Sequence, residues 1–330
     1  MQKRKRKYKI VTKGKSYDIS QSPLYKLCNQ RKLAAILNSS LPLLRSLRQD
    51  NGNYNVFSEK GSSRVIQNPT EKLDKVHSRI ASLICRIHQP NFIHSGRKGC
   101  SHVSNAEQHL DGAKLLTTDI RSFFQSTKKE MVFKFFTRRL LCSPDVSALL
   151  SDICTYDDHI PTGSRISMPL AYWSNFRMFD ELQRLSNKHD VVMTLYVDDL
   201  TFSGKNVTKL FLSTAKKIIE RHKHQMHPTK TNLYMQNDVK VVTGVVIKDG
   251  RKFIKNEQHK KIYQDIETWM GIRDIPNVNF PLKGRLLGRL NSLSSIEPRL
   301  KDKARTIVNY KPKQFPVNPT RTLADENTNS

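Results

Sequence analysis

Apolar residues recur along the chain with two different spacings, and each spacing predicts a different kind of element. From Thr70, apolar residues return every three or four positions as far as Ile87, which predicts a helix over 70–87. Residues 114–120 and 191–203 are instead apolar, β-branched runs, which predict a strand and a β-hairpin. The same reasoning predicts further elements, namely a helix over 24–37, a hairpin over 54–66, a helix over 210–219 and a hairpin over 240–254 that turns at Asp249-Gly250.

The two ends of the chain have compositions unlike its middle. Residues 1–15 are strongly basic, and we expect them to form an arm that is mobile until it meets phosphate. Beyond residue 255 the pattern is helical, with leucines on one face and Lys and Arg interleaved up to Lys313. The segment from Phe315 is rich in Pro, Thr and Asn and is predicted to be disordered.

Three aspartates stand at predicted strand ends. Asp198 and Asp199 occupy the turn of the hairpin 191–203, and Asp119 ends the strand 114–120. A bare Asp-Asp turn is a poor choice for a purely structural hairpin, although aspartates are also common in solvated turns. Carboxylates fixed on strand ends can bind two Mg²⁺ ions and promote phosphoryl transfer, because Mg²⁺ prefers oxygen ligands. The sequence therefore predicts a metal site formed by these three aspartates.

The residues after Asp119 predict an aromatic turn followed by a helix. Phe123 and Phe124 follow the strand, and Thr127 with Glu130 has the form of a capping box, so a helix should begin there. A second acidic pair, at 157–158, follows a mixed stretch rather than an apolar strand. We interpret that pair as part of a loop and not as the metal site.

The charge balance indicates what such a site acts on. The 330 residues contain 57 Lys and Arg against 29 Asp and Glu, a formal net charge of +28. These basic residues are spread along the whole chain, which favours a long groove for a polyanion, and nucleic acid is the leading partner. No apolar run approaches the roughly 18 residues of a membrane span, and no secretory signal is visible.

Cysteine and histidine usage argues against a zinc or disulfide protein. Five cysteines form no C-x-x-C pair, so we expect a reduced, cytoplasmic chain without a disulfide framework or zinc ribbon. His222, His224 and His227 lie in a basic, polar stretch and are expected to be solvated rather than zinc-bound.

Five short motifs carry a family resemblance. The YVDD at 196–199, the strand-borne Asp119 followed by two phenylalanines, and the HPTKTN at 227–232 resemble palm motifs of reverse transcriptases. The NAEQH at 105–109 and the VTG at 242–244 resemble the signatures of retron reverse transcriptases in particular. All five occur in the family's order, and the resemblance extends from about Pro23 to Tyr310.

The resemblance implies an α+β fold with the right-hand architecture of polymerases, in which a small antiparallel palm sheet is followed by a helical thumb. The expected parts are a basic arm over 1–20, fingers and the start of the palm over 21–118, palm over 119–254 with a finger segment at about 127–170, thumb over 255–313 and a disordered tail over 314–330.

The resemblance also implies roles for individual residues. Asp119, Asp198 and Asp199 would bind two Mg²⁺ ions, with the Ile120 carbonyl as a further ligand. Phe124 matches the steric-gate position, where a ring beneath the sugar excludes a 2′-OH and selects dNTPs. A phenylalanine that only packs in the core is the alternative for this position.

Basic residues match positions that hold phosphates in the family. Lys230 matches a palm lysine near the incoming triphosphate, although in so basic a chain it could simply line the groove. Arg64, and less directly Arg97 or Lys98, match basic positions of the fingers.

One loop departs from the family pattern. Thr162 and Gly163 stand at nucleotide-binding positions where Pro-Gln-Gly is usual, and Arg165 replaces a small residue. Threonine cannot reach as far as glutamine, so the contacts of this loop with template or nucleotide remain open.

A retron-type enzyme would be an RNA-directed DNA polymerase that copies a structured noncoding RNA, serving as template and primer, into a branched RNA–DNA hybrid (msDNA). The resemblance further implies a role in phage defence with a separate effector protein. Two alternatives are another bacterial or group II intron-like reverse transcriptase, which the short stretch after the thumb disfavours, and a catalytically idle RNA-binding scaffold, which the intact aspartates disfavour.

Overall fold

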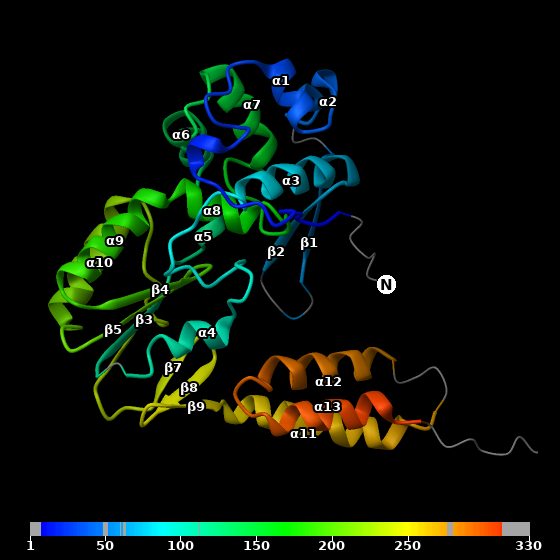
Figure 1. Cartoon of the computed structure of the whole chain (residues 1–330), viewed down its shortest axis with the longest axis vertical. Coiled ribbons are helices and arrows are strands. Elements are labelled where there is room, and N and C mark those ends of the chain that lie inside the picture. The colour runs from blue at the N-terminus through cyan, green and yellow to red at the C-terminus, as the bar shows by residue number, and fades with distance from the viewer. Residues whose placement is uncertain are drawn as a thin grey trace, which may run out of the picture. The chain divides into compact units, whose positions relative to one another are not determined.

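The computed structural model describes residues 8–48, 52–59, 61, 64–111, 113–275 and 280–311 (Figure 1). The chain divides into two compact units, Met1–Arg251 and Lys252–Ser330, and each unit has its own hydrophobic core. The first residues of the expected basic arm and the expected disordered tail lie outside the described residues.

A four-stranded sheet lies at the centre of the first unit. Its strands are β3 (Leu115–Asp119), β4 (Val192–Tyr196), β5 (Asp199–Ser203) and β6 (Asn232–Tyr234), in the order β4-β5-β3-β6. Neighbouring strands are antiparallel. Strands β3 and β5 are largely buried, which agrees with their continuous apolar sequence.

Helices supply most of the rest of this unit. Helices α9 (Phe176–Lys188) and α10 (Lys209–Arg221) pack against each other, and Figure 1 shows them side by side next to the sheet. The remaining helical segments are η1 (Ile19–Gln21), α1 (Gln30–Ile36), α2 (Leu41–Ser46), α3 (Glu71–Ile84), α4 (His102–Glu107), α5 (Phe123–Ser126), α6 (Lys129–Lys134), a π-helix η2 (Phe135–Arg139), α7 (Pro144–Cys154) and α8 (Ser167–Ser174).

The remaining described strands form two smaller sheets. Strands β1 (Tyr54–Ser58) and β2 (Val65–Pro69) form the expected antiparallel hairpin. Strands β7 (Lys240–Val242), β8 (Val245–Lys248) and β9 (Arg251–Ile254) form a three-stranded sheet. The prediction of one continuous strand over 240–247 was wrong. Thr243 and Gly244 have φ of 44° and 84°, so the VTG motif is itself a tight turn between β7 and β8.

The second unit is helical, as its apolar spacing predicted. It contains α11 (Asn256–Ile272), α12 (Phe280–Leu293) and α13 (Arg299–Asn309). Leucines of α12 and α13 join Trp269 in the core. Asp265 is buried and is paired with Arg285 at 2.7 Å and with Arg289. Helices long and apolar enough to cross a membrane are absent from the part of the chain that the structure describes.

Three local predictions were wrong for identifiable reasons. The start of the chain is not a mobile arm from residue 8 onward, because Val11 donates its N–H to Ser82 at 2.9 Å and Tyr17 donates to Arg86 O at 2.9 Å. The first helix begins at Gln30 rather than at 24, where the Asn29 side chain caps it. Thr127 forms no capping box, since its hydroxyl donates to Phe123 O within the preceding turn.

Candidate active site

Strand pairing brings the three predicted aspartates to one end of the sheet. Asp119 lies opposite Asp199 in the ladder between β3 and β5. Just beyond the ladder, the Ile120 N–H donates to the Asp198 carbonyl at 3.0 Å. The backbone of all three aspartates is therefore held by main-chain hydrogen bonds, and their relative positions do not depend on loop conformation.

The turn between β4 and β5 contains backbone strain. Val197 has φ of 63°, a region that β-branched residues rarely occupy and that costs on the order of 1–3 kcal/mol. Its N–H donates to Ser95 Oγ at 3.0 Å, and the Leu195 N–H donates to Phe92 O at 2.8 Å. The segment containing Phe92 and Ser95 thus runs along β4 and holds the strained turn in place.

Crowding and burial perturb the two aspartates of this turn. Burial and the neighbouring carboxylates raise the pKa of Asp198 above its usual value and that of Asp199 to about 6. Lys230, and for Asp198 also Arg64, oppose the shift by stabilising the ionised forms. The site is therefore short of positive charge where the aspartates lie closest.

Lys230 reaches the carboxylates from a loop that is bonded to β3. The His227 N–H donates to Asp119 O at 2.7 Å, and the hydroxyls of Thr118 and Thr231 hydrogen-bond at 2.7 Å. From this loop, Lys230 Nζ donates to Asp119 Oδ2 at 2.6 Å, which raises the pKa of the lysine. One carboxylate of the predicted metal site is thus already occupied by an ammonium group.

The oxygen donors of the site suit Mg²⁺, but they are not gathered for it in this conformation. Among the described residues, no group of three His, Cys, Asp or Glu side chains is arranged to hold a metal ion. A cavity of about 250 Å³ beside Asp199 and Lys230 extends to Tyr196 and to Thr243 and Gly244 of the VTG turn.

The two phenylalanines after Asp119 have different environments. Phe123 is 3% exposed and packs against Phe179 and His224. Phe124 is half-buried and only borders the core. Of the pair, Phe124 is the ring that retains an accessible face, as a steric gate requires, and its role stays a prediction.

The loop that differs from the family pattern, around Thr162 and Gly163, is hydrogen-bonded to the hairpin β1-β2. Thr162 donates from its N–H to Gln67 Oε1 at 2.9 Å and from its hydroxyl to Val65 O at 2.8 Å. Gly163 is packed so closely that an added Cβ would lie 2.4 Å from Gln67 O. Arg165 forms a two-bonded ion pair with Asp74 of α3, at 2.8 and 2.9 Å. Arg165 is thus accounted for by this ion pair with α3.

The basic residues expected in the fingers differ in whether they act on the aspartates. Arg64 precedes β2 and is close enough to act electrostatically on Asp198. Arg97 instead donates to Pro90 O and to the Asn91 side chain, at 3.4 and 3.0 Å, and Lys98 is exposed. Of the three, Arg64 is the one whose charge lowers the pKa of Asp198.

The histidine interpretation needs correction, because His224 is not solvated. It is 1% exposed and its ring nitrogens hydrogen-bond to Ser126 at 2.8 Å and Asn175 at 2.7 Å. Burial lowers its pKa to about 4, so it packs as a neutral ring. His222 hydrogen-bonds to Glu181 at 3.1 Å. The hydrophobic pattern of α10 ends before His224, so no sequence signal marked it as buried.

The two motifs that resemble retron signatures are connected through α4 (His102–Glu107) and the residues that follow it. His109 of NAEQH bridges Ser203 of β5 and Thr194 of β4, with both distances 2.7 Å. The Thr243 hydroxyl of VTG donates to His102 O of α4 at 2.7 Å. The segment formed by α4 and the residues up to His109 therefore links the sheet that carries the aspartates to the β7-β8 turn, a role that motif spacing alone did not reveal.

Comparison with known proteins places this geometry in context. Three similar curated proteins are the retron Se72 reverse transcriptase of Salmonella heidelberg and the retron Ec48 and Ec86 reverse transcriptases of Escherichia coli. They are 25%, 23% and 26% identical over 60%, 87% and 60% of this chain. These similarities support a retron-type reverse transcriptase. The matches cover 55%, 76% and 63% of those proteins, so by the first match the chain spans about half of its relative's length.

Comparisons at the level of families and solved structures are weaker. No protein-family model matches the chain. A foamy viral protease-reverse transcriptase in complex with double-stranded DNA aligns with 79% of this chain and 40% of its own, at 14% identity and a TM-score of 0.45. The expected mixture of helices and small antiparallel sheets is confirmed by the described elements themselves.

Proposed function

We propose that this chain is an RNA-directed DNA polymerase that adds deoxynucleotides to a primer end at Asp119, Asp198 and Asp199. The observation that carries the proposal is the pairing of Asp119 with Asp199 across β3 and β5, with Asp198 in the adjoining strained turn. The retron reverse transcriptases that the sequence resembles support the choice of reaction.

In this proposal the elements take the parts of a polymerase hand. The four-stranded sheet serves as palm, the β1-β2 hairpin with the helices around it serves as fingers, and α11 to α13 serve as thumb. The basic character of the chain supports a nucleic-acid groove, because phosphate neutralisation supplies most of the affinity of such proteins.

Different residues of the chain would bind the metal ions and the phosphates of the nucleotide. Asp119, Asp198 and Asp199, with the Ile120 carbonyl, would hold two Mg²⁺ ions, which when bound supply activation of the primer hydroxyl and charge neutralisation at the phosphates. Lys230 would exchange its bond to Asp119 for the triphosphate, and Arg64 would contact phosphate from the fingers side.

Selection of the sugar and placement of the template are assigned to neighbouring residues. The half-buried ring of Phe124 would exclude a 2′-OH. Thr162 and Gly163 would contribute main-chain carbonyls toward the nucleotide or template, because the N–H and the hydroxyl of Thr162 are both bonded to β2.

The similarity to retron reverse transcriptases supports a choice of template and product. We propose that a structured noncoding RNA serves as template and primer and that the product is a branched RNA–DNA hybrid. A separate effector protein, a role in phage defence and a cytoplasmic location complete this proposal.

Asp198→Asn tests the catalytic assignment. It should abolish dNTP incorporation in primer extension on an RNA template, since one metal ligand is lost. RNA binding in a gel-shift titration should persist, because affinity rests on many Lys and Arg contacts with phosphate. Asp157→Asn, in the loop that carries the other acidic pair, is the matched control and should retain activity. Retention of more than a few per cent of activity in Asp198→Asn would show that the site is misplaced.

A further inference from the structure

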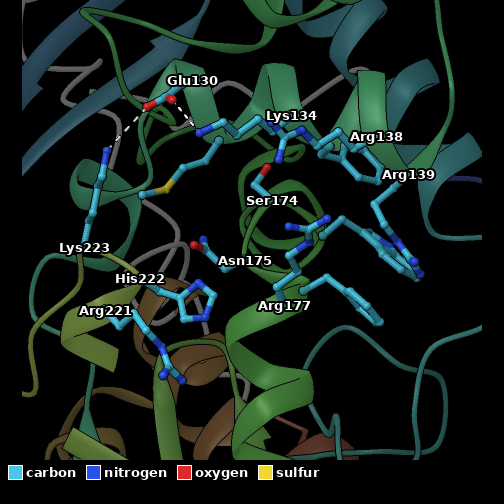
Figure 2. Close-up of a pocket in the computed structure, with 14 residues that line it drawn as sticks. Glu130, Lys134, Arg138, Arg139, Ser174, Asn175, Arg177, Arg221, His222 and Lys223 are labelled. Atoms are coloured by element: carbon cyan, nitrogen blue, oxygen red, sulfur yellow. Dashed lines mark hydrogen bonds and ion pairs between the residues drawn. The ribbon is translucent and has the colours of Figure 1, made fainter. Parts of the chain in front are cut away.

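A basic pocket lies in the first unit and shares no lining residue with the candidate active site. Four segments form it, namely α6 with η2, the end of α8, the start of α9, and the end of α10 (Figure 2). Its volume is about 240 Å³. The cations that line it are Lys134, Arg138, Arg139, Arg177, Arg221 and Lys223.

Acidic partners account for only half of these cations. Glu130 pairs with Lys134 and, at 3.7 Å, with Lys223, and Arg221 pairs with Glu181 outside the pocket. The remaining three, Arg138, Arg139 and Arg177, form no ion pair with a described residue. Arg139 lies over the Phe176 ring at 4.1 Å, an arrangement that orients the guanidinium without neutralising it.

Buried polar groups at the same pocket also have no partner. Trp173 is 4% exposed, and its Nε1 has no hydrogen-bond acceptor among the described residues. The same is true of Arg139 Nε and of the Ser174 hydroxyl. Most buried donors in proteins are hydrogen-bonded, so three unpartnered polar groups beside one basic pocket are unusual, although each lies just behind the pocket surface.

Local backbone adds to the positive potential. The first turn of α9, a helix of 13 residues, lines the pocket, and the Asn175 side chain does not cap it. That side chain is used elsewhere, donating to Thr127 Oγ1 at 2.9 Å and bonding His224 at 2.7 Å. The N–H groups of this turn and the macrodipole of α9 therefore remain available to an anion.

We infer that this basic pocket is a second nucleic-acid site, which holds the phosphodiester backbone of a strand outside the polymerase centre. Figure 2 shows Arg138, Arg139 and Arg177 on one side of the pocket and Lys223 on the other, so positive charge faces the pocket from both sides. Arginine forks bind phosphate oxygens with two parallel hydrogen bonds. The inference goes beyond the proposed function, and the binding measurements that test it do not require polymerase activity.

A triple variant isolates the contribution of this pocket. Arg138→Gln, Arg139→Gln and Arg177→Gln are combined, and binding of fluorescein-labelled single-stranded DNA is followed by anisotropy at several salt concentrations. Each lost phosphate contact lowers the slope of log K against log salt by about 0.7 for single strands, so three should lower it by about 2. Extrapolated from 1 M to 0.1 M salt, a slope change of about 2 corresponds to a loss of affinity of about a hundredfold.

The matched control removes three charges at the opposite ends of α9 and α10. Lys188→Gln, Lys205→Gln and Lys209→Gln change the net charge equally, and all three side chains are exposed. An equal loss of slope in both triple variants would overturn the inference, because binding would then follow net charge alone. Thermal melts of both variants by circular dichroism establish that each is folded.

Tryptophan fluorescence gives an independent measure. The chain has 2 tryptophans, so a Trp269→Phe background leaves Trp173 as the single reporter at the pocket. Oligonucleotide addition should change its emission, and the triple arginine variant should abolish the change. A change produced by inorganic pyrophosphate or dNTP, but not by DNA, would replace the nucleic-acid inference with a small-phosphate site. No change with any of these would also overturn it.

Discussion

The ion pair between Lys230 and Asp119 makes the most specific prediction about the candidate active site. The Lys230 ammonium lies 2.6 Å from the Asp119 carboxylate oxygen that a cation would need. We therefore expect Lys230→Met to bind a divalent cation more tightly than the unchanged chain in the absence of nucleotide.

The size of this effect follows from exposure. Two unit charges at about 4 Å interact by about 4 kcal/mol at an effective dielectric of 20. Lys230 is 57% exposed, however, while Asp119 is 13% exposed. An exposed pair of this kind contributes only about 0.2–1 kcal/mol. The expected gain in cation affinity is thus up to about fivefold. It is not the hundredfold or more that an interaction of about 4 kcal/mol would give.

Manganese binding measured by electron paramagnetic resonance reports this affinity without any turnover. Lys205→Met, an exposed lysine away from the carboxylates, should leave it unchanged. In contrast, dNTP incorporation by Lys230→Met should fall through a raised KM, because the variant lacks the ammonium that contacts the triphosphate. Unchanged or weaker manganese binding in Lys230→Met would refute the idea that Lys230 competes with a cation for Asp119.

Two other predictions concern nucleotide selection and pH. Phe124→Ala should admit ribonucleotides in primer extension, and unchanged dNTP preference would mean that the ring only borders the core. His77, His109 and His224 are buried, and desolvation lowers their pKa values to about 4, about 3 and about 4. Their neutral forms stabilise the fold fully above about pH 6.5, and this stability is lost as pH falls toward 4, by up to about 1.4 kcal/mol per pH unit for each ring. His109→Gln should therefore lower the pH slope of the unfolding free energy measured in urea between pH 6.5 and 4.5, and an identical slope would contradict the assignment.

Local pattern was sufficient for many elements. The spacing of apolar residues located α3 (Glu71–Ile84), α10 (Lys209–Arg221) and the hairpin of β4 and β5 to within a few residues. These elements follow rules that act over a few neighbours, because side-chain direction repeats with the helix or strand period. Spacing failed where a turn interrupted an apolar run, as at Thr243 and Gly244.

The sequence by itself determined which chemistry was available. It placed Asp119 at the end of one strand and Asp198 and Asp199 in the turn of another, and its positive charge selected a polyanionic partner. These are properties of single segments or of composition, so they need no knowledge of which segments meet.

Only the tertiary structure decided how those groups meet. The contact of Lys230 with Asp119 joins residues 111 positions apart, and His224 became a buried hydrogen-bonded ring through Ser126 and Asn175. The basic pocket likewise draws on four segments that no periodicity relates. Such contacts are set by strand register and helix packing between distant parts of the chain, and the physical reason they escape a sequence is that burial, pairing and desolvation depend on neighbours in space.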